Sequence, residues 1–239
     1  MRLDRALVER GLAPSRARAQ ALIAAGAVQV AGLTVKKASL DVPLNADLAV
    51  IDDPCPWVSR AGLKLDHALT AFRLRPHGIA LDLGASTGGF TEVLLARGAA
   101  HVHAVDVGHG QLAPSLAADP RVTLHEGINA RALPEGLVPP PDWITADLSF
   151  ISLRLALPPA LALGRSGTHL VALIKPQFEA GRESVGRGGI VRDAVVHRTV
   201  CEDTAGFLET AGWLVLGLTE SPIEGGSGNK EFLIAARRP

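Results

Sequence analysis

Aromatic side chains are scarce in this chain of 239 residues: they make up 4% of it, and tyrosine is absent. The core therefore has to be built from leucine, valine, isoleucine and alanine. Hydrophobic residues nevertheless make up 47% of the sequence and charged residues 20%, as in a globular protein that buries a sizeable core. The length suits one large domain, or a mid-sized domain with a small one attached.

Cysteine is also scarce, and a signal sequence and long apolar runs are lacking. Cys55 and Cys201 have neither CxxC spacing nor a nearby histidine pair, which argues against a disulfide framework or a zinc site and fits a reducing compartment. The amino terminus has no apolar stretch typical of a signal peptide. The most apolar run, residues 169–174, is far too short to span a bilayer. We therefore expect a cytoplasmic protein with no membrane partner and no metal.

The chain carries no net charge, since 24 basic residues balance 24 acidic ones. By itself this balance argues against a nucleic-acid partner, but the charge is unevenly distributed. Residues 1–40 contain seven basic side chains and only two acidic ones. Such a cluster is typical of a surface that binds phosphate groups, so the amino-terminal end is a candidate nucleic-acid interface.

The amino-terminal segment is predicted to form a small α+β unit. A short helix over Leu3–Glu9 ends at Gly11, and a second helix begins at Pro14, with Ser15 as its N-cap, and ends at Gly26. Short strands are expected over residues 28–30, 34–37 and 48–51. Prolines then interrupt the pattern. We therefore predict a first domain over residues 1–53, a linker over 54–59 and a second domain over 60–239.

From residue 60 onward, strands alternate with helices. We expect strands over residues 79–83, 101–105, 122–125, 143–146, 170–174, 213–218 and 231–236. The main helices are expected over residues 59–72, 90–97, 152–163 and 194–211. This alternation predicts an α/β domain with a mostly parallel sheet covered on both faces. The last two strands have no helix between them and should form an antiparallel hairpin.

A glycine-rich turn follows the first strand of this domain, in the segment Asp82-Leu83-Gly84-Ala85-Ser86-Thr87-Gly88-Gly89-Phe90. Glycine lets the backbone turn tightly and approach a ligand closely. The spacing is not that of a dinucleotide-binding fold, and no P-loop lysine follows. An acid at the end of the strand suits a cofactor with an ammonium group, so the turn predicts an S-adenosylmethionine site. A purely structural turn is about equally common for such glycines.

Two further segments fit the same cofactor. Asp106 and Val107 come at the end of the second strand, where an acid can accept hydrogen bonds from two ribose hydroxyls. Asn129, just after the third strand, is placed to contact the adenine. A surface aspartate and a turn asparagine are common in any protein, so each of these residues gains weight only when taken together with Asp82.

Four charged residues stand where an unpaired buried charge would be costly. Lys64 lies in the helix before the first strand, Asp147 ends the fourth strand, Lys175 ends the fifth, and Glu231 opens the last. The carboxyl ends of parallel strands share one edge, so Asp147 and Lys175 should lie near the glycine turn. A structural ion-pair network explains any one of these residues well, whereas the four together fit a mutually paired chemical set.

The amino-terminal unit resembles the S4 RNA-binding module over nearly its whole length. The motif runs Arg2-Leu3-Asp4-x-x-Leu7-x-x-x-Gly11-Leu12-x-x-Ser15-Arg16-x-x-Ala19-x-x-x-Ile23-x-x-Gly26-x-Val28-x-Val30-x-Gly32. The resemblance implies that the second helix and the lysine turn face structured RNA, and arginine suits phosphate geometry. The residues expected to bind RNA are Arg2, Arg5, Arg16, Arg18, Lys36 and Lys37. A solvated charged face is the alternative.

The whole chain is similar to the TlyA family of S4-containing ribosomal RNA 2′-O-methyltransferases, which have an FtsJ-like catalytic domain and are often labelled hemolysins. The similarity lies in the order Lys64, Asp147, Lys175, Glu231, in the 82–90 turn, and in the segment Ile174-Lys175-Pro176-Gln177-Phe178-Glu179. It implies a Rossmann-like class I methyltransferase, with a seven-stranded, mostly parallel sheet whose last strand is antiparallel. The implied substrate is a cytidine of ribosomal RNA or of a ribosomal subunit. The cofactor-binding residues would be Asp82, Gly84, Ala85, Ser86, Thr87, Gly88, Gly89, Phe90, Asp106, Val107, Asn129 and Asp147.

The expected chemistry is removal of the proton from a ribose 2′-hydroxyl. Lysine ordinarily keeps its own proton at neutral pH, but a neighbouring cation and partial burial favour the neutral amine. We therefore expect Lys175 to act as the base and Lys64 to disfavour its charged form and hold the nucleotide. Asp147 and Glu231 would orient the two amines. This chemistry requires no metal.

The glycine-rich segment 179–193 is expected to close over RNA, with Arg60, Arg182 and Arg187 as further RNA contacts. A flexible surface loop is the alternative. Three other functions stay open: a non-catalytic assembly factor that binds RNA, a membrane-lytic protein, and a methyltransferase that modifies another RNA or a base. Nothing in the sequence resembles a long cationic amphipathic helix, which argues against lysis. The lysine pair favours a hydroxyl over a base.

Overall fold

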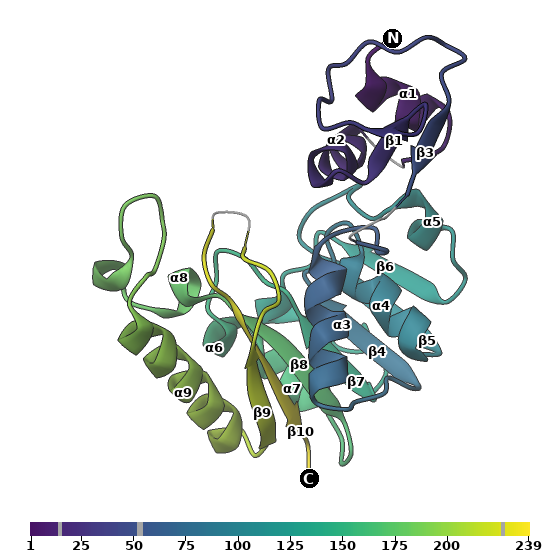
Figure 1. The fold of residues 1–239 in the computed structure, drawn as a ribbon. Coiled ribbons are helices and arrows are strands. Elements are labelled where there is room, and N and C mark those ends of the chain that lie inside the picture. The colour runs from purple at the N-terminus through teal and green to yellow at the C-terminus, as the bar shows by residue number, and fades with distance from the viewer. Residues whose placement is uncertain (14–15, 52–54, 226–227) are drawn as a thin grey trace. The chain divides into compact units, whose positions relative to one another are not determined.

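The computed structural model describes residues 1–13, 16–51, 55–225 and 228–239, and it divides the chain into two compact units, Met1–Pro56 and Trp57–Pro239. The first unit holds two helices and a three-stranded antiparallel sheet in the order β2-β1-β3 (Figure 1). Its elements are α1 (Leu3–Glu9), α2 (Arg16–Ala25), β1 (Val28–Val30), β2 (Leu33–Thr34) and β3 (Leu48–Val50).

Aliphatic side chains from both helices and from β1 form the core of this first unit, among them Leu3, Leu7, Leu22, Ile23 and Val28. The fold agrees with the expected α+β unit except that β2 ends at Thr34, so the strand predicted over residues 34–37 is wrong beyond its first residue. The predicted N-cap of the second helix, at residues 14 and 15, lies outside the described residues.

The second unit is built on a seven-stranded sheet in the order β6-β5-β4-β7-β8-β10-β9. All neighbouring strands pair in parallel except β10, which is antiparallel to both β8 and β9. This confirms the expected sheet and its antiparallel last strand. The strands are β4 (Ile79–Leu83), β5 (His101–Asp106), β6 (Val122–Glu126), β7 (Trp143–Ala146), β8 (His169–Ile174), β9 (Leu214–Glu220) and β10 (Phe232–Arg237).

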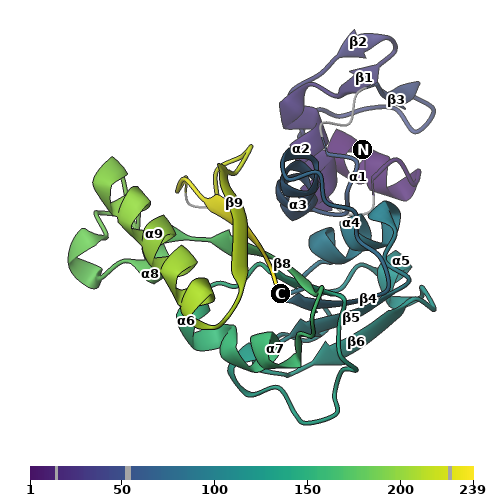
Figure 2. The same ribbon diagram turned by 90° about the horizontal axis from the view of Figure 1, so that it is seen from below.

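Helices cover both faces of this sheet (Figures 1 and 2). On one face, α3 (Ala61–Ala71) and α4 (Gly89–Arg97) pack with residues such as Ala80 and Val171. On the other face, α6 (Leu153–Ala156), α7 (Pro158–Leu163) and α9 (Ala194–Thr210) pack with residues such as Leu81 and Ile144. The central strands are therefore apolar on both sides, as parallel sheets require.

The helix predicted over residues 152–163 is in fact two helices, α6 and α7. Pro158 and Pro159 lack the backbone N–H that a continuous helix needs, whereas proline fits the first turn of a new helix. Short helical turns that the sequence did not indicate are α5 (Pro114–Ala117), η1 (Ala130–Ala132), α8 (Pro176–Glu179) and η2 (Arg182–Ser184).

Strand direction decides which residues share an edge. The carboxyl ends of β4, β5, β7 and β8 lie on the same edge because these strands are parallel. Since β10 runs the opposite way, its first residue, Phe232, pairs with Ile174 at the last residue of β8. The segment before β10 therefore reaches the same edge as the segments that follow β7 and β8.

Candidate active site

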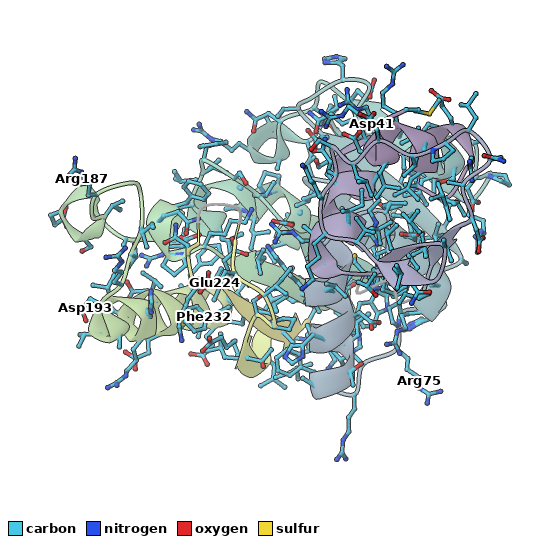
Figure 3. The ribbon with its side chains drawn as sticks, turned by 45° about the horizontal axis from the view of Figure 1, so that its top comes forward. Asp41, Arg75, Arg187, Asp193, Glu224 and Phe232 are labelled. Carbon is cyan, nitrogen blue, oxygen red and sulfur yellow. The ribbon has the colours of Figure 1, made fainter. Side chains whose placement is uncertain are left out.

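A cavity of about 330 Å³ opens at this carboxyl edge of the second unit, a volume typical of a small-molecule site. Its walls come from the start of α3, the glycine turn after β4, the segments after β7 and β8, and the connection between β9 and β10, where Figure 3 labels Glu224. The lining residues are Ser59, Arg60, Ala61, Lys64, Gly84, Ala85, Ser86, Thr87, Phe90, Asp147, Ser149, Lys175, Ile223 and Glu224.

The structure brings the four expected charged side chains to this cavity as two ion pairs. Lys64 Nζ lies 2.5 Å from Glu231 Oε2, and both side chains are buried. Lys175 Nζ lies 2.6 Å from Asp147 Oδ1. Lys64, Asp147 and Lys175 line the cavity themselves, while Glu231 lies behind Lys64. Each buried ammonium thus has a carboxylate partner, which offsets the cost of taking both charges out of water.

The position of Glu231 depends on a neighbouring glycine. A Cβ atom on Gly225 would lie 2.3 Å from Glu231 Oε1, which no real Cβ contact tolerates. The backbone of Gly225 in turn donates to the carbonyl of Asn229, two residues before Glu231. The connection between β9 and β10 is therefore folded around the carboxylate that holds Lys64.

Lys175 has two acceptors on the segment that follows β7. Besides the ion pair with Asp147, its ammonium donates a hydrogen bond of 2.8 Å to the hydroxyl of Ser149. Asp147 Oδ1 is buried and, among the described residues, makes no aligned hydrogen bond. Its contact with Lys175 is therefore ionic, and the ammonium is the group that compensates this buried oxygen.

The glycine turn forms the floor of the cavity and depends on two glycines. Gly84 has a φ of +79°, and a Cβ atom there would lie 2.5 Å from the carbonyl oxygen of Asp147. Gly88 has a φ of +97° at the N-cap of α4, where a Cβ atom would collide with Leu116. Only glycine fits either position, and the turn can therefore run close to the residues that follow β7.

Asp82 lies beneath the turn and does not line the cavity. Its side chain has no solvent exposure, and its two oxygens accept hydrogen bonds of 2.7 and 2.9 Å from the hydroxyls of Thr91 and Thr145. Burial raises the pKa of Asp82 to about 6, against the effect of these hydrogen bonds. In this arrangement the carboxylate faces the two threonines, and the ammonium contact expected from the sequence stays a prediction.

Asp106 ties the glycine turn to the end of β5. It accepts hydrogen bonds from the backbone N–H of Ser86 at 2.8 Å and of Gly108 at 2.7 Å, one on each oxygen. Each carboxylate oxygen can accept a second donor, so ribose hydroxyls still have acceptors here. Val107 is 63% exposed beside it, and Asn129 is exposed and caps η1 by accepting from the N–H of Arg131.

The basic residues of the first unit are only partly free to bind a ligand. The carboxylate of Asp4 is fully buried and accepts hydrogen bonds from Arg2, Arg16 and Gln20, at 2.7 to 3.1 Å. These bonds, that of Arg2 foremost, hold the pKa of Asp4 well below its usual range.

Arg2 and Arg16 are nevertheless half exposed. Arg18 donates to the carbonyl of Cys55. The remaining candidates of this unit, Arg5, Lys36 and Lys37, are exposed.

The basic residues of the second unit lie in two places. Arg60 lines the cavity and is exposed. Arg187 is exposed on the loop before α9 and projects away from the body of the unit (Figure 3). With Arg192 it borders a second cavity of about 340 Å³. The side chain of Arg182 lies outside the described residues.

The sequence did not single out Phe150, which follows Ser149 at the rim of the cavity. This side chain is 91% exposed, and its backbone has a φ of +65°, a region that a bulky residue seldom adopts. Its ring lies 5.2 Å from that of Phe178. No sequence signal marked this residue, because single exposed apolar side chains are ordinary on protein surfaces.

The described residues contain no group of three histidine, cysteine or acidic side chains placed to hold a metal ion. Within the same ranges, no helix is both long enough and apolar enough to cross a membrane.

Comparisons with known proteins identify the family to which the chain belongs. The family model of the FtsJ-like methyltransferases matches residues 57–238, and that of the S4 domain matches residues 1–48. The chain is 47% identical to the 16S/23S rRNA (cytidine-2′-O)-methyltransferase TlyA of Mycobacterium tuberculosis, over 99% of this chain and 89% of that protein. It is 46% identical to the putative rRNA methyltransferase YqxC of Bacillus subtilis, over 100% and 86%.

A solved structure is also similar over the full length. The putative hemolysin from Streptococcus thermophilus matches with a TM-score of 0.77 and 40% identity, over 100% of this chain and 88% of that one. High identity along the whole chain, two matching family models and the paired charges at the sheet edge all agree. The chain therefore belongs to the TlyA family, which joins an S4 domain to an FtsJ-like methyltransferase domain.

Proposed function

We propose that this protein transfers a methyl group from S-adenosylmethionine to the ribose 2′-hydroxyl of a cytidine in ribosomal RNA. The observation that carries the proposal is the pair of buried lysine–carboxylate contacts in one cavity beside the glycine turn. The similarity to relatives named as ribosomal RNA cytidine-2′-O-methyltransferases supports the choice of substrate. Relatives that match this chain are named as ribosomal RNA methyltransferases. Because ribosomal RNA is found in the cytoplasm, we place this protein there.

The residues present fit the cofactor. Residues 84–87 line the cavity, and Gly84 lets this turn run close to the carbonyl of Asp147. Asp106 stands at the end of β5 with lone pairs left for ribose hydroxyls. We assign the exposed side chains of Val107 and Asn129 to the adenine, as expected from their places after β5 and β6. When bound, S-adenosylmethionine supplies a methyl group on a positively charged sulfur, which a nucleophile can attack.

The lysines activate that nucleophile. Lys175 lines the cavity and takes the proton of the 2′-hydroxyl, while Asp147 orients its amine. Lys64 lines the same cavity and can hold the nucleotide, and Glu231 keeps Lys64 in place. The pairs Lys64–Glu231 and Lys175–Asp147 are already oriented in a largely buried site, so the reaction does not require water molecules to reorient around the reacting groups.

The surroundings of the cavity suit RNA. A ribose reaches Lys175 only if its nucleotide leaves the stack, and the exposed ring of Phe150 offers a face for an unstacked base. Arg60 can contact a phosphate at the cavity, and exposed Arg187, together with Arg182 of the same loop, is assigned RNA contacts from the sequence. In the first unit, Arg5, Lys36 and Lys37 are the exposed phosphate contacts, with Arg2 and Arg16 contributing from beside Asp4.

The experiment that tests this function is a map of the product. Purified ribosomal subunits that lack the modification are incubated with the protein and S-adenosylmethionine, and 2′-O-methylated nucleotides are identified by mass spectrometry. We expect one or a few cytidines to gain a 2′-O-methyl group. RNA that is bound but stays unmethylated would contradict the proposal and favour a non-catalytic assembly factor. A methyl group on a base would contradict the assigned chemistry.

A further inference from the structure

Ser149 has no role in the chemistry described so far, yet it contacts the proposed base directly. Its hydroxyl oxygen accepts the 2.8 Å hydrogen bond from Lys175 Nζ, and its side chain lines the cavity. Asp147, which forms the ion pair with the same nitrogen, stands only two residues earlier. Both acceptors of Lys175 therefore come from one short segment at the end of β7.

That segment is fixed along its length. Residues 147–153 run beside residues 175–179, and contacts join the two at both ends. The rings of Phe150 and Phe178 lie 5.2 Å apart. The carboxylate of Glu179 accepts hydrogen bonds of 2.6 and 2.8 Å from the hydroxyl and the backbone N–H at the start of α6. Ser149 therefore lies beside Lys175 in a segment that is fixed by the ring contact of Phe150 and by the hydrogen bonds to Glu179.

Asp147 and Ser149 together limit the direction in which the lone pair of the Lys175 amine can point. A lysine nitrogen has four tetrahedral directions, one of which is its bond to Cε. In the neutral amine two directions carry N–H bonds and one carries the lone pair. If Ser149 accepts one N–H bond and the other is directed toward the nearby Asp147 carboxylate, 2.6 Å away, the lone pair takes the direction that is left. General-base catalysis requires that this direction meets the hydroxyl proton.

We propose that Ser149 is a positioning residue that, together with Asp147, stops rotation about the Cε–Nζ bond of Lys175 and keeps its lone pair directed into the cavity. The inference rests on the proposed role of Lys175 as the base. Ser149 acts through Lys175 and takes no proton from the substrate.

The test is the pH dependence of methyl transfer in Ser149→Ala and Ser149→Thr. Single-turnover rates on ribosomal subunits are measured with radiolabelled S-adenosylmethionine from about pH 6 to pH 9.5. We expect Ser149→Ala to be about tenfold slower on the alkaline plateau, since the amine rotates freely. Ser149→Thr keeps the hydroxyl and should restore the rate.

Controls separate this inference from the function on which it rests. Ser166→Ala removes an exposed serine that lies before β8, at the opposite edge of the sheet, and should behave as the parent protein. Affinity for S-adenosylmethionine and the Tm should stay unchanged in all three variants. A Ser149→Ala variant at the parental rate, or a Ser149→Thr variant as slow as Ser149→Ala, would overturn the inference. Activity retained in Lys175→Ala would instead contradict the proposed function itself.

Discussion

Asp82 carries a carboxyl group with no solvent exposure, and two threonine hydroxyls donate to it. It belongs to the support of the glycine turn rather than to its ligand-facing side. From the sequence, an acid at the end of the first strand could be recognised as important, and its position was predicted correctly. Its partners could not be predicted, because Thr91 and Thr145 come from α4 and β7 and meet Asp82 only in the folded chain.

Asp82→Asn should remove a pH dependence of stability. Burial raises the pKa of Asp82 to about 6, above the value near 4 of an unfolded chain, so the folded protein retains this proton longer. The stabilisation is fully present below pH 4 and is lost as the pH rises through 6, at a cost of up to about 3 kcal/mol. Asparagine stays neutral and can still pair with both threonines. Thermal unfolding between pH 4 and pH 8 should show the variant gaining stability relative to the parent as the pH rises. Parallel curves would contradict this assignment.

Asp4 shows the opposite shift. Its hydrogen bonds to Arg2, Gln20 and Arg16 lower its pKa, so it stabilises the first unit above about pH 4 and ceases to do so as the pH falls. Asp4→Asn should destabilise α1 and α2 by about 3 kcal/mol at pH 7, because it leaves the arginines without their acid. Hydrogen exchange in these two helices should become faster, while exchange in β4, β7 and β8 should not change. Equal protection in both proteins would show that the cluster contributes little.

Among the elements, those with strong periodicity and clear ends were predictable, such as α1, α4 and the strands β4 and β7. The division of residues 152–163 was missed because its apolar pattern is continuous, although the adjacent prolines forbid one helix. The position of Glu231 follows from a different rule. An antiparallel last strand starts at the edge where the parallel strands end, so topology brings this residue to Lys64.

Gly225 in the connection between β9 and β10 should be needed for activity. Gly225→Ala would place a Cβ atom 2.3 Å from the present position of Glu231 Oε1 and displace the carboxylate from Lys64. We expect methyl transfer to fall by about a hundredfold, with S-adenosylmethionine affinity unchanged. Gly206→Ala is the matched control, because Gly206 lies on the exposed side of α9 with open space around it and should gain slightly in stability. Full activity in Gly225→Ala would mean that Glu231 is not needed where it lies.

For the whole molecule, composition alone was misleading. A net charge of zero conceals a basic stretch over residues 1–40, and the local count of charges there pointed to RNA together with the S4 motif. That count also overestimated the free charge, since Asp4 binds two of the arginines. The pairing could not be predicted from the sequence, because helix α2 brings Arg16 and Gln20 to Asp4 across an intervening loop.

RNA affinity should therefore depend most on the exposed lysines. Replacing Lys36 and Lys37 together by alanine should weaken binding to ribosomal RNA and lower the slope of log Kd against log salt concentration by about two. Binding of S-adenosylmethionine should stay the same. Lys230→Ala, which removes an exposed lysine paired with Glu220, serves as the control and should leave the slope unchanged. A double variant that binds with the parental slope would place the RNA interface elsewhere.

We propose that Lys175 accepts the proton of a ribose hydroxyl at the site that it shares with Asp147, Lys64 and Glu231. The most direct test is the single-turnover rate of methyl transfer to ribosomal subunits by Lys175→Ala, with S-adenosylmethionine affinity measured in parallel by calorimetry. We expect the rate of Lys175→Ala to fall by at least about a hundredfold while its affinity for the cofactor is retained. A variant that binds the cofactor and methylates ribosomal RNA at the parental rate would contradict it.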